Sequence, residues 1–247
     1  MLDRIYMQMQ AMQVMSRSQD VTADNLANIN TPGFKGNKMF YHMFKENING
    51  EEVVKSVPQT QVDLSQGILE PTGNAFDMAL NGDGFFKVDV DGKEMLTRDG
   101  RFQLNSDGFL VNSSGAKVQG ESGPIQLSGL FQAQNAEGVG TPMLEVSKEG
   151  NILLNGKIQD KLKIVGVKDP THLTRHGNSY FSVKNEVELN EEANGMVMQG
   201  FFEKGNVQPL TEMVDMMRNM QMFETQQKAL KTTDDMLGQA TARIGRF

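Results

Sequence analysis

The residues best suited to chemistry are two histidines four positions apart, His172 and His176. On a helix that spacing would put both rings on one face, where they could bind zinc. The sequence between them, Leu-Thr-Arg, lacks the glutamate of hydrolytic zinc motifs, and Asp169, Pro170 and Gly177 flank the pair. We therefore place both histidines in a loop and predict neither a metal site nor a cofactor.

Other catalytic arrangements are missing from the sequence. The chain has no cysteine, which removes disulfides, thiolate metal ligands and thiol catalysis together. It also lacks a Gly-x-Ser-x-Gly nucleophile motif. Neighbouring carboxylates, at Glu51 and Glu52 and again at Glu191 and Glu192, are typical of solvated loops. We predict that the protein is not an enzyme.

Calcium-binding and nucleotide-binding motifs are incomplete. The acidic residues Asp89, Asp91 and Glu94 lack both the glycine-rich calcium repeat and the terminal glutamate spacing of an EF-hand. The segment 82–84, Gly-Asp-Gly, lacks the third glycine and the following helix of a dinucleotide fold. A net charge of −7 argues against a nucleic-acid partner. No run approaches the roughly 20 apolar residues of a membrane helix, and the N-terminus lacks the apolar centre of a signal peptide.

The strongest periodic pattern lies in the C-terminal segment 206–247. Apolar residues recur every seven positions, at Met216, Phe223, Leu230, Leu237 and Ile244. Pro209 suits the first helical turn, and Met213 and Met220 occupy companion positions of the repeat. The pattern predicts a long helix with one apolar seam that needs a partner.

The N-terminal segment 1–36 carries a second helical pattern. Its repeat steps by three and four residues through Leu2, Ile5, Met9, Met12, Ser16, Gln19, Ala23 and Leu26. A Thr-Pro-Gly turn ends this helix near Asn30. Asn25 and Asn28 are poor residues for a helix interior, so we expect their amides to fix its register against another helix. The apolar face of this helix is the candidate partner of the C-terminal seam.

The segment between the two helices is expected to be extended at first and then rich in strands. Residues 37–82 are polar and irregular, and predict a connecting arm with at most short strands. Residues 83–205 contain Asp-Gly pairs at 91–92, 99–100 and 107–108, which predict an antiparallel meander from Phe85 to Gly120. The predicted fold class is α+β, with long terminal helices paired as a coiled-coil-like layer and a central antiparallel β-rich domain.

Three segments resemble signatures of the bacterial flagellar rod and hook family, whose members are axial proteins. Residues 23–36 are similar to its N-terminal pattern, Asn-Asn-Leu-Ala-Asn followed by Thr-x-Gly-Phe-Lys, with Asp24 in place of the first Asn. Residues 66–86 resemble the second signature, which ends in Gly-x-Gly-Phe-Phe. Residues 195–207 resemble the closing segment, with Gly205 in place of the usual Ser.

The resemblance implies an assembly function. In this family the terminal helices form the inner layer of a tube, and the β-rich region lies outside. The subunits leave the cytoplasm through the flagellar export apparatus without a cleaved signal and polymerise into the rod, so other rod and hook-basal-body proteins are the expected partners. The expected packing residues are Leu2, Ile5, Met9, Met12, Asn25, Leu26, Asn28, Phe34, Met213, Met216, Met220, Phe223, Leu230, Leu237 and Ile244.

Within the family, the sequence is more similar to the proximal-rod member that carries a central β domain than to the distal-rod protein. The opening Asp3-Arg4-Ile5-Tyr6 and the closing residues Arg218 and 222–224 carry this likeness. Two alternatives stay open on composition. One is a soluble module whose β domain binds a carbohydrate or protein on a homodimerising helical stalk. The other is an enzyme that uses the histidine pair with a third ligand.

Overall fold

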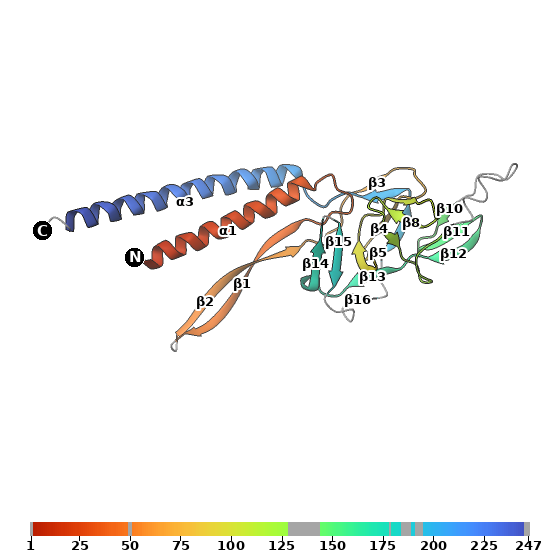
Figure 1. Cartoon of the computed structure of the whole chain (residues 1–247), viewed down its shortest axis with the longest axis horizontal. Coiled ribbons are helices and arrows are strands. Elements are labelled where there is room, and N and C mark those ends of the chain that lie inside the picture. Colours follow the sequence, from red (N-terminus) through yellow and green to blue (C-terminus); the bar gives the residue numbers. More distant parts are fainter. Residues whose placement is uncertain are drawn as a thin grey trace. The chain divides into compact units, whose positions relative to one another are not determined.

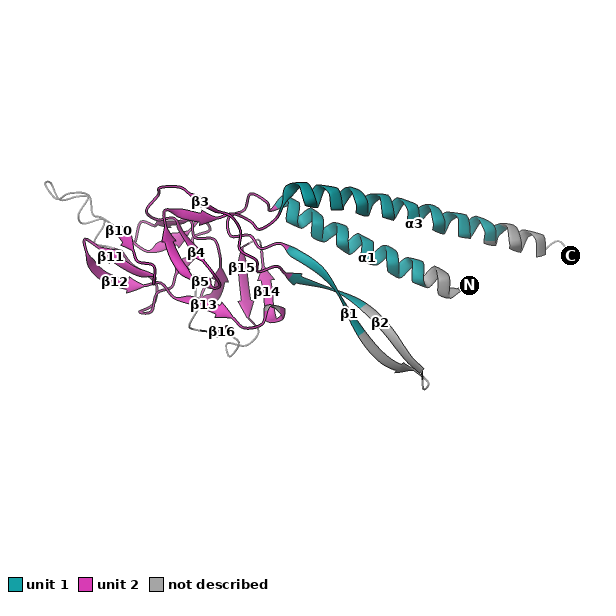
Figure 2. Ribbon diagram, turned by 180° about the vertical axis from the view of Figure 1, so that it is seen from behind, with its two compact units in different colours: residues 1–27, 37–61, 208–247 teal, residues 28–36, 62–207 magenta. Residues whose placement is uncertain are grey.

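The computed structural model describes residues 2–48, 51–127, 144–177, 179–183, 189–190 and 195–244. The chain divides into two compact units, coloured separately in Figure 2. Residues 1–27, 37–61 and 208–247 form the first, here called the helical unit. Residues 28–36 and 62–207 form the second, here called the β-rich unit. The signature turn at 28–36, expected to belong with the N-terminal helix, thus groups with the β-rich part of the chain.

The helical unit is built on two long helices, α1 (Leu2–Ala27) and α3 (Pro209–Ile244), which lie side by side (Figure 1). Pro209 is the first residue of α3, where a missing N–H costs nothing, and Glu212 lies in its first turn. None of the described helices is apolar enough over a sufficient length to cross a membrane.

The rest of the helical unit differs from the expected arm. Residues 37–62 contain two long strands, β1 (Asn37–Ile48) and β2 (Glu51–Val62), which pair with each other. On β1, Phe40, Tyr41 and Met43 are exposed and Met39 is half-buried. None of the described side chains of this strand is buried, and a strand without a buried face has no reason to alternate polar and apolar residues.

The β-rich unit is formed by short strands in several sheets. The strands before the undescribed segment 128–143 are β3 (Leu69–Pro71), β4 (Met78–Asn81), β5 (Phe85–Val90), β6 (Lys93–Thr97), β7 (Phe102–Leu104), β8 (Leu110–Asn112) and β9 (Lys117–Val118). Those after it are β10 (Leu144–Val146), β11 (Asn151–Leu154), β12 (Lys157–Lys161), β13 (Ile164–Val167), β14 (Leu173–His176), β15 (Tyr180–Val183), β16 (Leu189–Asn190), β17 (Met196–Gln199) and β18 (Phe201–Glu203), with a 3-10 turn at Pro170–His172.

The sheets are antiparallel, and the last strands pair with the first. The largest sheet has the order β14-β15-β6-β5-β9-β8-β7, with β13 paired to β5 and β16 paired to β13. A separate sheet joins β10, β11 and β12. Near the end of the unit, β17 pairs with β4 and β18 pairs with β3. The chain therefore enters and leaves the β-rich unit through neighbouring segments.

Two Asp-Gly turns of the predicted meander are present. Asp91 and Gly92 join β5 to β6 with φ angles of 52° and 79°, the left-handed geometry of the tightest hairpins. Gly108, with φ of 80°, lies between the paired strands β7 and β8. Asn155 and Gly156 also have positive φ angles, and they form the hairpin turn between β11 and β12.

The third pair, Asp99 and Gly100, does not form a hairpin turn, because β6 and β7 do not pair with each other. Gly100 instead packs against the backbone of β4, and its carbonyl accepts a 2.9 Å hydrogen bond from the N–H of Met78. A Cβ atom added at Gly100 would lie 1.6 Å from the carbonyl oxygen of Met78. Here glycine is required by close approach of two backbones and not by a turn.

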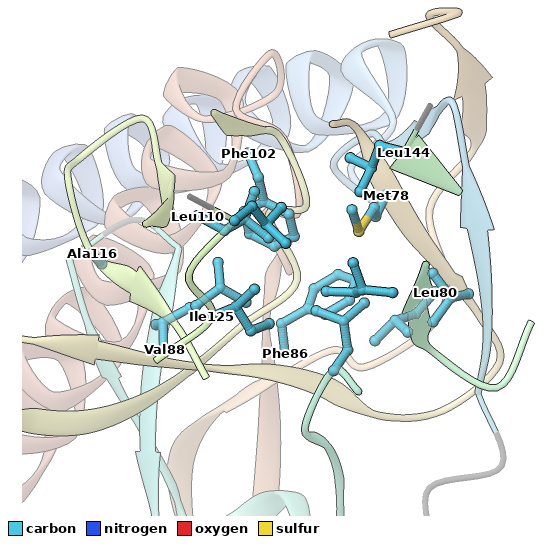
Figure 3. Close-up of a cluster of buried hydrophobic side chains, with 14 of the residues drawn as sticks. Met78, Leu80, Phe86, Val88, Phe102, Leu110, Ala116, Ile125 and Leu144 are labelled. Atoms are coloured by element: carbon cyan, nitrogen blue, oxygen red, sulfur yellow. The ribbon is translucent and has the colours of Figure 1, made fainter. Parts of the chain in front are cut away.

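Two apolar clusters fill the β-rich unit. Figure 3 shows the larger one, in which Met78, Phe86, Phe102 and Leu110 lie among residues of β4 to β11. The smaller cluster holds Phe85, Leu96, Val165 and Phe181. Phe85 and Phe86 follow each other in β5, so this strand contributes one ring to each cluster, as expected of a strand buried on both faces.

Candidate functional site

The signature turn is held by a group of segments that are distant in the sequence. We call this group the signature clamp: residues 33–36, 63–67 and 203–206 together with Arg98, all within the β-rich unit. Residues 33–36 follow helix α1 in the chain, and residues 203–206 precede helix α3. The clamp therefore joins the two places from which the terminal helices continue.

Backbone groups form the first layer of the clamp. The N–H of Gly33 donates to the carbonyl of Glu203 at 2.7 Å, and the N–H of Asn206 donates to the carbonyl of Phe34 at 3.3 Å. The side chain of Asn206 accepts from the N–H of Gly36 at 2.7 Å and donates to the carbonyl of Asp63 at 2.8 Å. Asn206 thus connects three segments: residues 33–36, residues 63–67 after the β1–β2 hairpin, and its own segment 203–206.

A buried ion triad forms the second layer. The side chain of Glu203 is 1 % exposed. Its Oε1 accepts from Lys35 Nζ at 2.7 Å and from the N–H of Gly67 at 2.8 Å, and its Oε2 accepts from Arg98 at 3.1 Å. Burial lowers the pKa of both Lys35 and Arg98, and the charge of Glu203 opposes this. Both buried cations are therefore stabilised by one carboxylate.

Sterics explain the Gly-Phe part of the signature. Gly33 has φ of +65°, and a Cβ atom there would lie 2.2 Å from the backbone nitrogen of Asp99. Phe34 is fully buried, and the guanidinium of Arg175 on β14 lies 4.5 Å from its ring centroid. Arg175 also donates to the carbonyl of Lys35. Glycine lets the turn approach β6, and an aromatic ring then packs beneath a cation.

Sequence reasoning selected Phe34 but missed Arg98, Arg175 and Glu203. Glu203 stands in the closing signature and Arg98 stands in the Thr-Arg-Asp-Gly segment, so both positions could be noticed from the sequence. Their pairing could not, because Lys35 and Glu203 are 168 residues apart and no local pattern connects them. Arg175 has no signature around it.

In the helical unit, two polar contacts join α1 to α3. Asn25 donates to Glu212 Oε1 at 3.2 Å, and Asn219 donates to the hydroxyl of Ser18 at 3.1 Å. The partners on α1 are seven residues apart, and those on α3 are seven apart in the opposite direction, so the helices run antiparallel. Polar contacts one heptad apart are the kind that fix register between helices.

Asn25 also forms hydrogen bonds with the first residue of β1, in addition to the expected contact with another helix. Its amide donates to the carbonyl of Asn37 at 2.9 Å, and its oxygen accepts from the N–H of Asn37 at 2.8 Å. Asn28 lies in the β-rich unit, where its carbonyl accepts from the N–H of Thr31 at 2.9 Å and its side-chain oxygen accepts from the Thr31 hydroxyl. Asn28 therefore supports the turn after the helix.

The face that α1 turns toward α3 differs from the expected apolar repeat. Met12, Gln19 and Leu26 are half-buried, but Met9, Ser16 and Ala23 are exposed. The most buried α1 positions are instead Thr22 and Asn25. Buried polar residues therefore lie near the end of α1, beside the half-buried Leu26. The side chains of Leu2 and Ile5 lie outside the described part of the chain.

On α3 the two sets of seam positions differ in exposure. Met216, Phe223 and Leu230 are half-buried. Met213 and Met220 are 49 % and 48 % exposed, and Met217 is more exposed still. The side chains of Leu237 and Ile244 lie outside the described residues. The α3 helix thus packs one stripe within the chain and keeps a second, methionine-rich stripe in solvent.

We expect replacement of Asn25 by alanine to destabilise the helical unit. Three hydrogen bonds would be lost and the N–H of Asn37 would lose its partner, at a cost of about 1–3 kcal/mol. Urea unfolding followed by the helical circular dichroism signal measures this. Gln10→Ala, at an exposed position of α1, is the control and should change the free energy of unfolding by less than about 0.5 kcal/mol. Equal effects of the two changes would contradict the bridging role of Asn25.

Glu212 should make the helical unit sensitive to pH. Burial raises the pKa of its carboxyl above the usual 4.5, nearby Asp215 adds to the rise, and the hydrogen bond from Asn25 opposes it. A raised carboxyl pKa means that the folded state prefers the proton, so this contribution to stability is present below pH 4.5 and is lost as pH rises through the folded pKa. Glu212→Gln should therefore stabilise the helices more at pH 7 than at pH 4, measured by urea unfolding at both values. An equal effect at both pH values would contradict this.

The histidine pair and a nearby cavity offer little chemistry. His172 lies in the 3-10 turn and His176 on β14, where its Nε2 is 2.8 Å from the Ser182 hydroxyl. Among the described residues, no group of three His, Cys, Asp or Glu side chains is placed to hold a metal ion. A cavity of about 550 Å³ in the β-rich unit has Asp99, Asn112 and Tyr180 in its lining. Asn112 donates to the Tyr180 hydroxyl at 2.6 Å, so these polar groups already bind each other.

Comparison with known protein families gives three matches in chain order. Residues 5–35 match the family described as flagella basal body rod protein. Residues 79–154 match the D1 domain of the flagellar hook protein FlgE/F/G family, and residues 198–243 match the C-terminal family of the basal body rod FlgEFG proteins. The first match contains residues 33–35 of the signature clamp and the last contains residues 203–206, and none of the three describes a catalytic family.

Individual proteins match over nearly the whole chain. The flagellar basal-body rod protein FlgF of Caulobacter vibrioides is 29 % identical, over 98 % of this chain and 98 % of its own length. FlgF of Salmonella typhimurium is also 29 % identical, over 96 % of both chains. The rod protein FlgG of Borreliella burgdorferi is 30 % identical, over 89 % of this chain and 90 % of its own. Each of these relatives is named as a flagellar basal-body rod protein.

Proposed function

The chain belongs to the family of flagellar basal-body rod proteins, and we propose that it polymerises through its terminal helices as a structural subunit of the proximal rod. The observation that carries this proposal is the second stripe of α3. Met213, Met217 and Met220 keep about half of their surface in solvent, although they lie on a helix whose other stripe packs against α1. Flexible, polarizable side chains of this kind suit a surface that packs against other molecules.

Exposed apolar residues on α1 support the same proposal. Met7 and Met9 are 67 % and 52 % exposed, so both helices present methionines to solvent in the single chain. Burying them against further helices would extend the antiparallel pair into a layer with coiled-coil-like packing. Contacts between different faces of identical or related subunits generate a helical tube when they do not close into a ring.

Family membership supports the expected partners and location. We propose that the neighbours are other rod and hook-basal-body axial proteins, that the subunit works in the flagellar basal body, and that the flagellar export apparatus delivers it without a cleaved signal. The matches to FlgF proteins span slightly more of both chains than the match to FlgG of Borreliella burgdorferi, which favours the proximal over the distal rod.

Cysteine crosslinking in intact cells tests the proposal, because the chain has no cysteine of its own. Met213→Cys and Met220→Cys should give ladders of crosslinked species that require an assembled basal body. Glu121→Cys, at an exposed site of the β-rich unit, is the control for accidental collisions and should give weaker ladders or none. A single dimer band that persists without any flagellar structure would favour the soluble binding module on a dimerising stalk.

A further inference from the structure

The cavity of about 550 Å³ in the β-rich unit has a mostly polar lining. The lining comes from residues 30–32 of the signature turn, from Asp99 and Arg101, and from the ends of the β8–β9 and β14–β15 hairpins. Pro32 and the ring of Tyr180 are its apolar surfaces, and its other side chains are polar. The volume falls within the range of about 300–1,000 Å³ that is typical of small-molecule sites.

Asp99 gives this cavity a buried carboxyl group with an open acceptor position. The residue is 5 % exposed, and its Oδ1 accepts a hydrogen bond from the N–H of Arg101 at 3.1 Å. No donor among the described residues forms a hydrogen bond with Oδ2. Burial raises the pKa of Asp99, and the hydrogen bond from Arg101 opposes this rise. Because a buried polar atom without a partner costs free energy, a donor placed at Oδ2 would be stabilising.

Tyr180 gives the cavity a donor that is held in place. Its hydroxyl accepts a 2.6 Å hydrogen bond from the side chain of Asn112, whose own oxygen accepts from the N–H groups of Ser114 and Ala116. Asn112 is thereby fully used, but the hydrogen of the Tyr180 hydroxyl has no acceptor among the described residues. Tyr180 also lies on β15 and pairs with Thr97 of β6, so a sheet positions this donor.

The balance of charge and polarity selects the kind of ligand. Asp99 and Arg101 carry opposite charges, so the cavity favours neither an anion nor a cation. Its small apolar surface offers little to an apolar ligand. A hydroxyl group both donates and accepts, as water does, so a ligand with several hydroxyls can replace water here and leave no group unpaired. The hydroxyls of Ser113, Ser114 and Ser179 in the lining offer further hydrogen bonds of this kind.

We propose that the cavity binds a neutral carbohydrate of one or two sugar rings, in which one hydroxyl donates to Asp99 and another accepts from Tyr180. The site is built on strands and tight turns, which hold such groups in place better than long loops do. All of the lining residues belong to the β-rich unit. The inference therefore does not depend on the proposed assembly through the helices.

Nuclear magnetic resonance titration of the full-length chain tests the site. The probes are maltose, cellobiose and N,N′-diacetylchitobiose, with the neutral peptide triglycine as a comparison. We expect at least one disaccharide to shift the amide signals of Arg101, Ser114 and Ser179 with a dissociation constant below about 10 mM. The amide of Ile152, in the larger apolar cluster, should not shift. Triglycine should leave all four signals unchanged.

Two variants locate the binding in the cavity. Asp99→Asn keeps the size of the side chain and an acceptor for the N–H of Arg101, and it should weaken binding by at least tenfold because a charged acceptor is lost. Ser114→Trp adds bulk at an exposed position of the lining and should abolish binding. Glu121→Trp adds the same bulk at an exposed position outside the lining, so it should bind as the natural chain does.

Three outcomes would overturn the sugar site. They are no shift with any of the three disaccharides, shifts with triglycine instead, and equal binding by the Ser114→Trp and Glu121→Trp chains. If the Asp99 variant does not fold, the two tryptophan variants still decide.

Discussion

Replacement of Glu203 by glutamine should destabilise the β-rich unit by about 3–5 kcal/mol, more than the loss of any exposed ion pair. The change keeps the size of the side chain and leaves an oxygen that can accept a hydrogen bond. It removes the carboxylate that forms an ion pair with both Lys35 and Arg98, and leaves these two buried cations with the carbonyls of Ser65 and Gly82 as their remaining direct acceptors. Urea unfolding of the full-length chain at pH 7, followed by circular dichroism, measures the loss.

The matched control for Glu203 is Glu70 on β3, the strand that pairs with β18. Glu70 forms an ion pair with Lys204 at 2.6 Å, but both side chains are more than 40 % exposed. Exposed pairs contribute about 0–1 kcal/mol, so Glu70→Gln should be close to neutral. A Glu203→Gln chain that unfolds at the same urea concentration as Glu70→Gln would show that the triad does not hold the clamp.

Gly100→Ala should be the most damaging small substitution in the β-rich unit, with a loss of about 3 kcal/mol or a failure to fold. The added Cβ atom would lie 1.6 Å from the Met78 carbonyl oxygen and 3.1 Å from the Phe86 ring. The nearer atom is backbone, and the Met78 N–H is itself bonded to Gly100, so neither strand can move alone. Thermal unfolding of the variant measures the effect.

Gly238→Ala is the opposite case and serves as the control. Gly238 lies within α3, and a Cβ atom there would meet nothing within 4 Å in the described part of the chain. Alanine is favoured over glycine in a helix by about 0.5–1 kcal/mol, so this change should stabilise the helical unit slightly. If Gly100→Ala were as well tolerated as Gly238→Ala, the close backbone approach at β4 would be contradicted.

The sequence predicts those parts of the fold whose cause is local. The start of α3 at Pro209 follows from helix-end chemistry, and the hairpin at Asp91 and Gly92 follows from the φ angles that its two residues tolerate. The identical dipeptide at Asp99 and Gly100 does something else, because a distant strand, β4, approaches it. The dipeptide predicts which φ angles its residues tolerate, but it does not predict which distant strand will approach it.

The parts that were missed depend on contacts between distant or polar residues. None of the described side chains of the β1–β2 hairpin is buried, so no alternation distinguishes these residues from an irregular arm. The contact between Ser18 of α1 and Asn219 of α3 was missed because it is a hydrogen bond, which apolar periodicity does not register. The ion triad joins residues from three distant segments, and only the folded chain brings them together.

We propose that the chain is a rod subunit that assembles through the exposed stripe of its helices. Mass spectrometry of purified hook–basal bodies tests it most directly, in cells that produce either the natural chain or a Met213→Asp, Met220→Asp variant. Exposed positions tolerate charge in the single chain, so the variant should fold and be produced normally. We expect the natural chain to be present in the basal bodies and the variant to be absent. Basal bodies without the natural chain, or with the variant at the same level, would contradict the account.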